Sequence, residues 1–290
     1  MMVRMTAFAL LLAAVLSAQD FSKIQIEKVS AGNRFTEGPV WSKEGFLVFS
    51  DVPNNRMLKF IPGTGNAGYR ENTNGANGNA FDSQGRLLTC ETRTRRVVRQ
   101  KKDGELEVLA EKFEGKRFNA PNDIVVRKDG HIWFTDPAFG AQADTRELDF
   151  YGVFHISPKG EVSVAAKQKG RPNGIALSGN GRILYVANSD ERVVYAYDVD
   201  GQGRATNERV VVKDIPGPPD GLKLDEKGNF YIAATDLVIY TPQGKLLKKI
   251  EMPEKPSNVA FGDADYQTLF LTARMSVYRM RLDVKGAVNF

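Results

Sequence analysis

The chain has 290 residues, and its 40 Lys and Arg against 35 Asp and Glu give a formal net charge of +5. This length suffices for a substantial hydrophobic core, while 27 Gly and 13 Pro leave little room for long helices. The densest basic cluster, residues 93–102, has no interleaved aromatic side chains, so a nucleic-acid groove is not expected.

The first 18 residues have the pattern of a secretory signal peptide. Arg4 supplies a positive charge, residues 7–16 form an apolar run, and Ser17 and Ala18 are small residues near the expected cleavage site. The run is too short for a good membrane span, and nothing later in the chain resembles one. We predict a cleaved signal peptide, with an uncleaved anchor as the alternative, and a mature protein that is periplasmic or secreted.

After this segment the chain contains six copies of one pattern. Each copy has an acidic or amide residue, a short apolar strand, a turn that contains Gly, and a second apolar strand. Successive copies begin 38 to 51 residues apart, which indicates a repeat architecture. With the strand-like segments that follow, four antiparallel strands in each of six copies predict an all-β, six-bladed β-propeller as a single domain of residues 19–290.

The strand-like residues 22–30 precede the first copy, and residues 276–284 end the last one. We expect the N-terminal strand to pair with the last blade and close the ring, because closure leaves few exposed sheet edges. Two separate β-domains are an alternative, but the even spacing of the copies argues against a linker between them. Cys90, on a predicted strand, is expected to be a buried small residue.

Each copy has one oxygen-bearing side chain just ahead of its first strand, and we call these six the mouth residues. The first strand of each blade should line the axial channel, so the mouth residues should converge at one end of it. A single Asn-Gly or Asp-Gly is often a turn, but here the hairpin turn comes later in the copy. Carboxylate and amide oxygens are typical ligands of a hard cation such as calcium. The mouth residues are Glu37, Asn77, Asn122, Asn173, Asp220 and Asn258.

Four segments resemble signature sequences of the senescence marker protein/gluconolactonase/luciferin-regenerating enzyme family of six-bladed propellers. They are FTEGPVW, APNDIVVRKDGHIWFTDPAFG, RPNGIALSGNGRILYVANSD and PPDGLKLDEKGNFYIAA. The resemblance covers nearly all of the chain after the signal peptide, and FTDPAFG is similar to the bacterial gluconolactonase-like branch. The resemblance implies a metal-dependent hydrolase that opens a lactone ring, with sugar lactones as the expected small-molecule substrates.

The resemblance also implies roles for individual residues. Glu37, Asn173 and Asp220 match the family's metal ligands, and the expected metal is calcium, with magnesium, manganese and zinc as alternatives. Asp220 is expected to be the catalytic general base as well as a ligand, and Glu37 is the alternative base. The tetrahedral oxyanion would then be stabilised by the cation.

Asn122 and Asn77 are the expected substrate contacts, and Asn122 matches a family residue that lies beside the metal. Asp123 is expected to brace Asn122. Animal members of the family carry an Arg at the position of Ala120 and an acidic residue at a position near Gly140, and this chain lacks both sugar-recognising contacts. The identity of the lactone is therefore not predicted. Two alternative functions stay open. They are organophosphate or other ester hydrolysis on the same scaffold, and non-catalytic binding of a ligand at the channel mouth.

Overall fold

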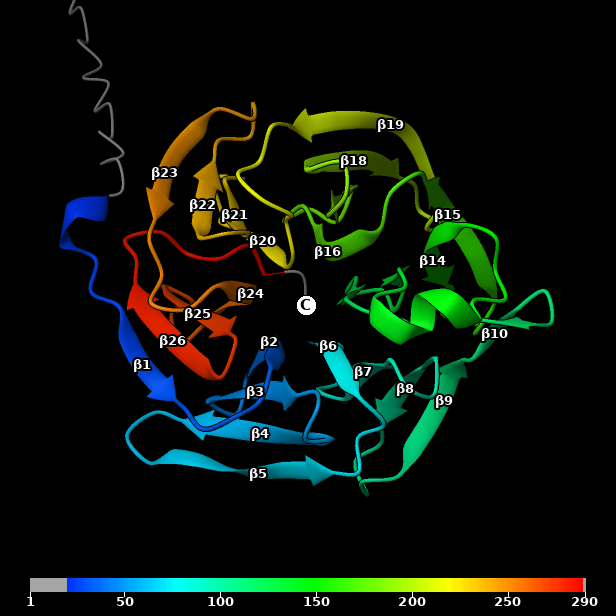
Figure 1. Ribbon diagram of the computed structural model, residues 1–290, viewed down its shortest axis with the longest axis horizontal. Coiled ribbons are helices and arrows are strands. Elements are labelled where there is room, and N and C mark those ends of the chain that lie inside the picture. Colours follow the sequence, from blue (N-terminus) through cyan, green and yellow to red (C-terminus); the bar gives the residue numbers. More distant parts are fainter. Residues whose placement is uncertain (1–19, 289–290) are drawn as a thin grey trace, which may run out of the picture.

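The structure is a computed structural model that describes residues 20–288. Six four-stranded antiparallel sheets surround a central axis, as Figure 1 shows. This arrangement confirms the predicted six-bladed β-propeller. The predicted signal peptide lies outside the described residues. Within residues 20–288, no helix has both the length and the apolar character needed to cross a membrane.

The first three sheets each contain four strands that are consecutive in the chain. The first sheet contains β2 (Thr36–Ser42), β3 (Phe46–Asp51), β4 (Arg56–Ile61) and β5 (Gly65–Glu71). The second contains β6 (Ala76–Phe81), β7 (Leu87–Glu91), β8 (Arg96–Gln100) and β9 (Leu106–Ala110). The third contains β12 (Ile124–Val126), β13 (Ile132–Asp136), β14 (Tyr151–Ile156) and β15 (Val162–Gln168). A separate hairpin of β10 (Lys112–Phe113) and β11 (Lys116–Arg117) connects the second and third sheets.

The remaining sheets continue this order around the ring. The fourth contains β16 (Pro172–Leu177), β17 (Ile183–Asn188), β18 (Val193–Val199) and β19 (Ala205–Val212). The fifth contains β20 (Leu222–Leu224), β21 (Phe230–Ala233), β22 (Leu237–Tyr240) and β23 (Leu246–Ile250). The sixth contains β24 (Pro256–Gly262), β25 (Thr268–Ala273), β26 (Ser276–Arg281) and β1 (Glu27–Ser30).

The sixth sheet closes the ring with the N-terminal strand, as predicted. β1 pairs antiparallel with β26, and Glu27 lies opposite Arg279 in the register. Their side chains form an ion pair with an Nε to Oε2 distance of 2.8 Å. Because β1 supplies the fourth strand, β26 does not expose its hydrogen-bonding edge to solvent.

The hydrophobic core lies between neighbouring blades. Trp41 of the first blade stacks on Phe270 of the sixth, with ring centroids 5.5 Å apart. Tyr185 and Phe230 make an edge contact between the fourth and fifth blades, with centroids 5.0 Å apart. Such aromatic pairs bury large apolar surfaces and add roughly 0.5–1.5 kcal/mol through their geometry. Cys90 is buried, as predicted, and the buried aromatic residues of this core include Trp41, Trp133, Phe134 and Phe230.

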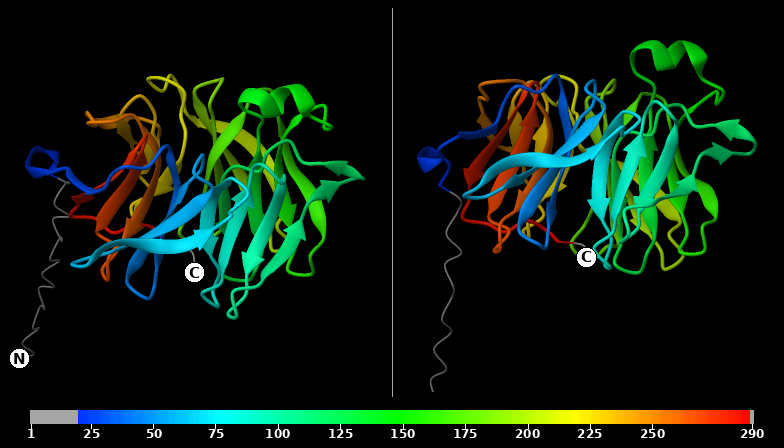
Figure 2. Two further views of the ribbon diagram at one scale, coloured as in Figure 1. Left: turned by 60° about the horizontal axis from the view of Figure 1, so that its bottom comes forward. Right: turned by 90° about the horizontal axis from the view of Figure 1, so that it is seen from below.

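The two ends of the axial channel differ in what lies next to them (Figure 2). The 3₁₀ helix η2 (Gly140–Thr145) follows β13, and β13 is antiparallel to β12, so η2 stands over the face where β12 begins. We call this end the mouth. At the other end, which we call the tail end, the amide of Ala287 donates to the carbonyl of Leu224, the last residue of β20. The short 3₁₀ helix η1 (Phe21–Lys23) precedes β1 at the periphery.

Candidate active site

Glycines that follow four of the mouth residues allow neighbouring blades to approach closely. A Cβ atom on Gly38 would lie 1.9 Å from the backbone oxygen of Asn77, and one on Gly174 would lie 2.3 Å from that of Asp220. Side chains cannot be accommodated at such distances, so only glycine permits these contacts. The glycine in these dipeptides therefore serves contact between blades rather than a turn. Gly78 and Gly221 meet the next blade in the same way.

Hydroxyl groups tie the backbone of the mouth residues to the preceding blade. The Ser50 hydroxyl donates to the carbonyl of Asn77 at 2.8 Å. The Thr135 hydroxyl donates to the carbonyl of Asn173 at 2.7 Å. Both bonds are made in the interior, where an unpaired carbonyl would be costly. The positions of Asn77 and Asn173 are therefore each set by two blades.

Acidic residues near the end of the second strand hold the loop that leads into the first strand of the same blade. Asp136 accepts the backbone amides of Asn119 and Ala120, each at 2.8 Å. Burial raises the pKa of Asp136 to about 7, although these two amide donors act in the opposite direction. Asp51 and Asp190 accept backbone amides in the corresponding loops, at 3.0 and 2.8 Å. The acids in FSD, FTD and NSD, which close three of the copies, are a sequence signal for these anchors that the sequence analysis did not use.

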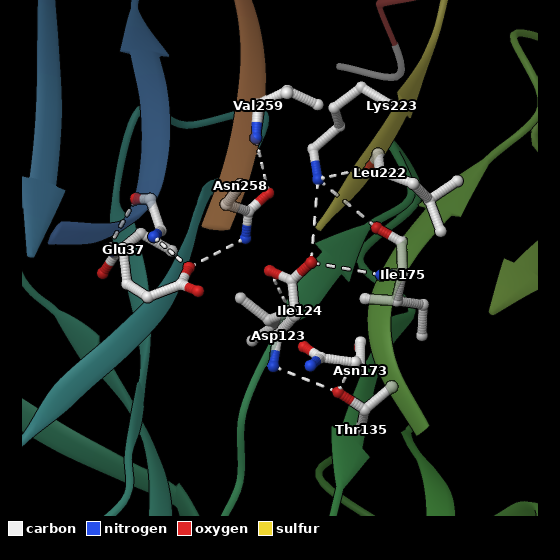
Figure 3. Close-up of polar contacts among 12 residues, drawn as sticks. Glu37, Asp123, Ile124, Thr135, Asn173, Ile175, Leu222, Lys223, Asn258 and Val259 are labelled. Carbon is white, nitrogen blue, oxygen red and sulfur yellow. Dashed lines mark hydrogen bonds and ion pairs between the residues drawn. The ribbon is translucent and has the colours of Figure 1, made fainter. Parts of the chain in front are cut away.

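Glu37 is a buried carboxylate at the mouth. Its Oε2 accepts the backbone amide of Gly38 at 2.8 Å and the side-chain amide of Asn258 at 3.1 Å, and Figure 3 shows the latter bond. Burial, followed by the negative charge of Asp220, raises the pKa of Glu37 well above its ordinary range. The two carboxylates therefore interact electrostatically, although they are distant in sequence. Asn258, to which no individual role was assigned, is thus a direct partner of Glu37.

Asp220 is the second mouth carboxylate and is partly exposed. Its backbone amide donates to the carbonyl of Ala233 at 2.8 Å, and its carbonyl accepts the amide of Gly174 at 3.0 Å. Burial raises the pKa of Asp220 to about 7, and the charge of Lys255 and a hydrogen bond with Asn173 oppose this rise. The backbone is therefore held by its own blade and by its neighbour, while the carboxylate has few partners.

The amide side chains at the mouth differ in how they are bonded. Asn173 Nδ2 donates to Ser189 Oγ at 3.2 Å. Asn77 Oδ1 is buried and has no hydrogen-bond partner among the described residues. Asn122 is buried, and its backbone amide donates to the carbonyl of Thr135 at 2.8 Å. An unpaired buried oxygen costs stability unless a ligand satisfies it, so Asn77 offers a free acceptor at this end of the channel.

Asp123 makes its contacts with the backbone of two inner strands. Its Oδ1 accepts the amide of Ile124 at 3.0 Å, and its Oδ2 accepts the amide of Ile175 at 3.1 Å (Figure 3). These bonds link β12 to β16. The expected role of Asp123 as a brace for Asn122 stays a prediction.

The donor set at the mouth fits a hard divalent cation. Residues 20–288 contain no group of three or more Asp, Glu, His and Cys side chains that could hold a metal ion. The candidate set instead combines the carboxylates of Glu37 and Asp220 with amide oxygens such as that of Asn173. The buried carboxylate of Glu37 and the partly exposed one of Asp220, which repel one another, together with an unpaired amide oxygen, are the chemical environment that an oxygen-preferring cation stabilises.

A family model described as "SMP-30/Gluconolactonase/LRE-like region" matches residues 35–275, a span that includes every mouth residue. The chain belongs to this family. Membership confirms the resemblance inferred from the four sequence segments.

Members of the family and related solved structures match over most of their lengths. A gluconolactonase of Zymomonas mobilis subsp. mobilis is 33% identical, and the match covers 90% of this chain and 82% of that protein. A solved structure of a gluconolactonase from Xanthomonas campestris is 30% identical, with a TM-score of 0.85 and coverage of 93% of both chains. The diisopropyl-fluorophosphatase of Loligo vulgaris is 29% identical, over 81% of this chain and 84% of that protein.

Proposed function

We propose that this protein is a hydrolase that opens lactone rings, with sugar lactones as the substrate class and a divalent cation as cofactor. Its family and its similarity to gluconolactonases support this activity. The observation that carries the proposal is the pairing of Glu37, which is buried, with Asp220, which is partly exposed: both are carboxylates at the mouth, and their charges act on each other. A lactone is a small uncharged ester, and a metal-assisted site at the end of a narrow channel suits its hydrolysis.

Glu37, Asn173 and Asp220 would hold the cation, which we propose to be calcium, with magnesium, manganese and zinc as alternatives. Calcium takes six to eight oxygen ligands, so three protein ligands leave room for water and substrate. When bound, the cation polarises the lactone carbonyl and stabilises the negative charge that develops on its oxygen.

The residues of the chain would perform the proton transfers and the positioning. Asp220 takes a proton from a water molecule while the water oxygen bonds to the carbonyl carbon. The bond between that carbon and the ring oxygen then breaks, and Asp220 returns the proton to the ring oxygen. The product is the open hydroxy acid. Asn122 and Asn77 orient the lactone through their side-chain amides, and Glu37 is the alternative base.

A pH-drop assay with purified protein and glucono-1,5-lactone tests the proposal. The rate should exceed spontaneous hydrolysis, fall to the spontaneous rate after chelation, and return when calcium is added. A protein that binds metal but gives no rate above the spontaneous one would contradict lactonase activity and favour a binding role. Full activity after chelation, with metal removal verified by elemental analysis, would contradict metal dependence alone.

Organophosphate hydrolysis is a second candidate, favoured by the similarity to a diisopropyl-fluorophosphatase. A fluorophosphate carries an electrophilic phosphorus whose oxygen a cation at the mouth would polarise in the same way as a carbonyl. Fluoride release from a panel of fluorophosphates, measured beside lactone hydrolysis, separates the two activities. A higher kcat/KM for a fluorophosphate would reverse the order of the two candidates.

We also propose that the protein is exported, on the support of the first 18 residues alone. Expression with and without this segment, followed by separation of periplasm and cytoplasm, tests it. Retention of the full-length product in the cytoplasm would contradict export.

A further inference from the structure

Two charged residues of the axial channel depart from the repeat pattern. The residue directly after the mouth residue is Gly in four blades and Val259 in the sixth, but the third blade has Asp123 there. The residue three places after the mouth residue is apolar in five blades, but the fifth blade has Lys223 there. The apolar residues at that position are Val40, Ala80, Val125, Ala176 and Phe261.

These two exceptional side chains meet inside the channel. Lys223 Nζ lies 3.8 Å from Asp123 Oδ2. The same ammonium group donates to the carbonyls of Leu222 at 3.0 Å and Ile175 at 3.4 Å (Figure 3). Asp123 is only 2% exposed, so its carboxylate is compensated by this ammonium group and by backbone amides rather than by water.

Toward the tail end the channel contains a mainly apolar cavity of about 100 Å³. Among the described residues that line this cavity, Lys223 alone carries a charge. The side chain of Lys223 is 28% exposed, and the described lining of this cavity offers it no carboxylate. The charge of Lys223 is therefore directed toward Asp123 and the mouth.

Lys223 contributes a positive charge to the balance along the axis, in addition to Lys255, whose charge acts on Asp220. Asp123 is a third carboxylate near the mouth, and its charge acts on both Glu37 and Asp220. A divalent cation neutralises two negative charges, so one would remain unbalanced in the interior. The ammonium group of Lys223, 3.8 Å from Asp123 Oδ2, supplies a positive charge for that carboxylate, whereas the charge of Lys255 acts on Asp220.

We infer that Lys223 is the internal counter-ion of the cation site: it neutralises Asp123 and leaves the charges of Glu37 and Asp220 for one divalent ion. The inference rests on the proposed function, because it requires a cation at the mouth. Lys223 is a positioning residue, since it acts through Asp123. The pairing of two exceptions to the repeat, of opposite charge and in contact, carries the assignment.

Calcium titration of chelator-stripped protein by calorimetry at pH 8 tests this inference without measuring activity. Wild-type protein should bind one ion. Lys223→Met removes a positive charge close to the site and keeps the length of the side chain, so calcium should bind about tenfold more tightly. Asp123→Asn should weaken binding about tenfold, and the double variant should bind with nearly wild-type affinity because both charges are gone.

Lys249→Met is the matched control, because Lys249 pairs with Asp236 at 2.9 Å on the outer strand β23. Its calcium affinity should equal that of the wild type. Unchanged or weaker binding by Lys223→Met would overturn the inference, and if that variant does not fold, unchanged binding by Asp123→Asn would do so. Wild-type protein that binds no divalent ion would instead refute the proposed cation site, and the inference with it.

Discussion

The two ends of the axial channel are built by the same six inner strands but have opposite chemistry. The mouth has carboxylates and amides, including the buried Glu37 and the partly exposed Asp220, whose pKa values are raised by burial. The tail end has apolar side chains around a cavity, and the C-terminal segment is bonded there through Gly286 to Tyr266 and through Ala287 to Leu224. At the mouth, repulsion between carboxylates therefore destabilises the ligand-free protein, and a bound cation would relieve it. At the tail end, the burial of apolar side chains stabilises the fold.

The largest effect should come from removing the proposed base at the mouth. Asp220→Asn keeps the shape of the side chain but cannot accept the proton, so the lactonase rate should fall about a thousandfold. The melting temperature should not fall, because a buried charge has been removed. Lactone hydrolysis and thermal unfolding, measured on the same preparation, check both statements. A variant with normal turnover would exclude Asp220 from the mechanism.

The next largest effect should be a loss of stability, caused by a substitution where neighbouring blades approach closely at the mouth. Gly38→Ala places a Cβ atom 1.9 Å from the Asn77 oxygen at a backbone φ of +53°, so the free energy of unfolding should fall by about 3 kcal/mol or more. Gly85→Ala is the control, since Gly85 also has a positive φ, +75°, but no atom lies within 4 Å of the added Cβ. It should cost only about 1 kcal/mol. Equal losses in urea unfolding would show that backbone strain, not contact between blades, makes Gly38 necessary.

The repulsion between carboxylates at the mouth should make the stability of the metal-free protein depend on pH. The pKa of Asp220 is raised to about 7 by burial, so the folded state binds more protons than the unfolded state between about pH 4 and 7. The free energy of unfolding should therefore fall as pH rises through this range, by on the order of 2 kcal/mol after allowance for partial exposure. Glu37 and Asp136 contribute with the same sign, so the difference from Asp220→Asn measures Asp220 together with its effect on the pKa of Glu37.

Denaturant unfolding in a chelator at several pH values measures this dependence. Calcium should reduce the decline, because it stabilises the ionised carboxylates. A stability that rises with pH in the metal-free protein would contradict the raised pKa values at the mouth.

The smallest effect should come from the tail end. Ala80→Val adds apolar volume to the cavity of about 100 Å³ that Ala80 lines. The free energy of unfolding should change by less than about 1 kcal/mol, and kcat/KM should stay within about twofold of wild type. Urea unfolding and the lactone assay check this expectation. A loss of activity comparable to that of Asp220→Asn would show that the two ends are not independent.

The sequence by itself determined the repeat and much of the fold. Strand-length apolar runs separated by Gly-containing turns predicted six blades, and the unpaired segment before the first copy predicted closure by β1. It also determined which polar residues share one end of the channel, because Glu37 and Asp220 occupy the same place in their copies. These features are local and periodic, so a single sequence reveals them.

Only the tertiary structure decided which residues touch across the axis. The contacts of Gly38 with the second blade, of Asn258 with Glu37 and of Lys223 with Asp123 all join different blades. They depend on the rotation and spacing of blades around the closed ring, which no local pattern contains. Physically, the repeat specifies each blade, whereas the charge balance at the mouth emerges only when side chains from different blades share one buried space of low dielectric constant.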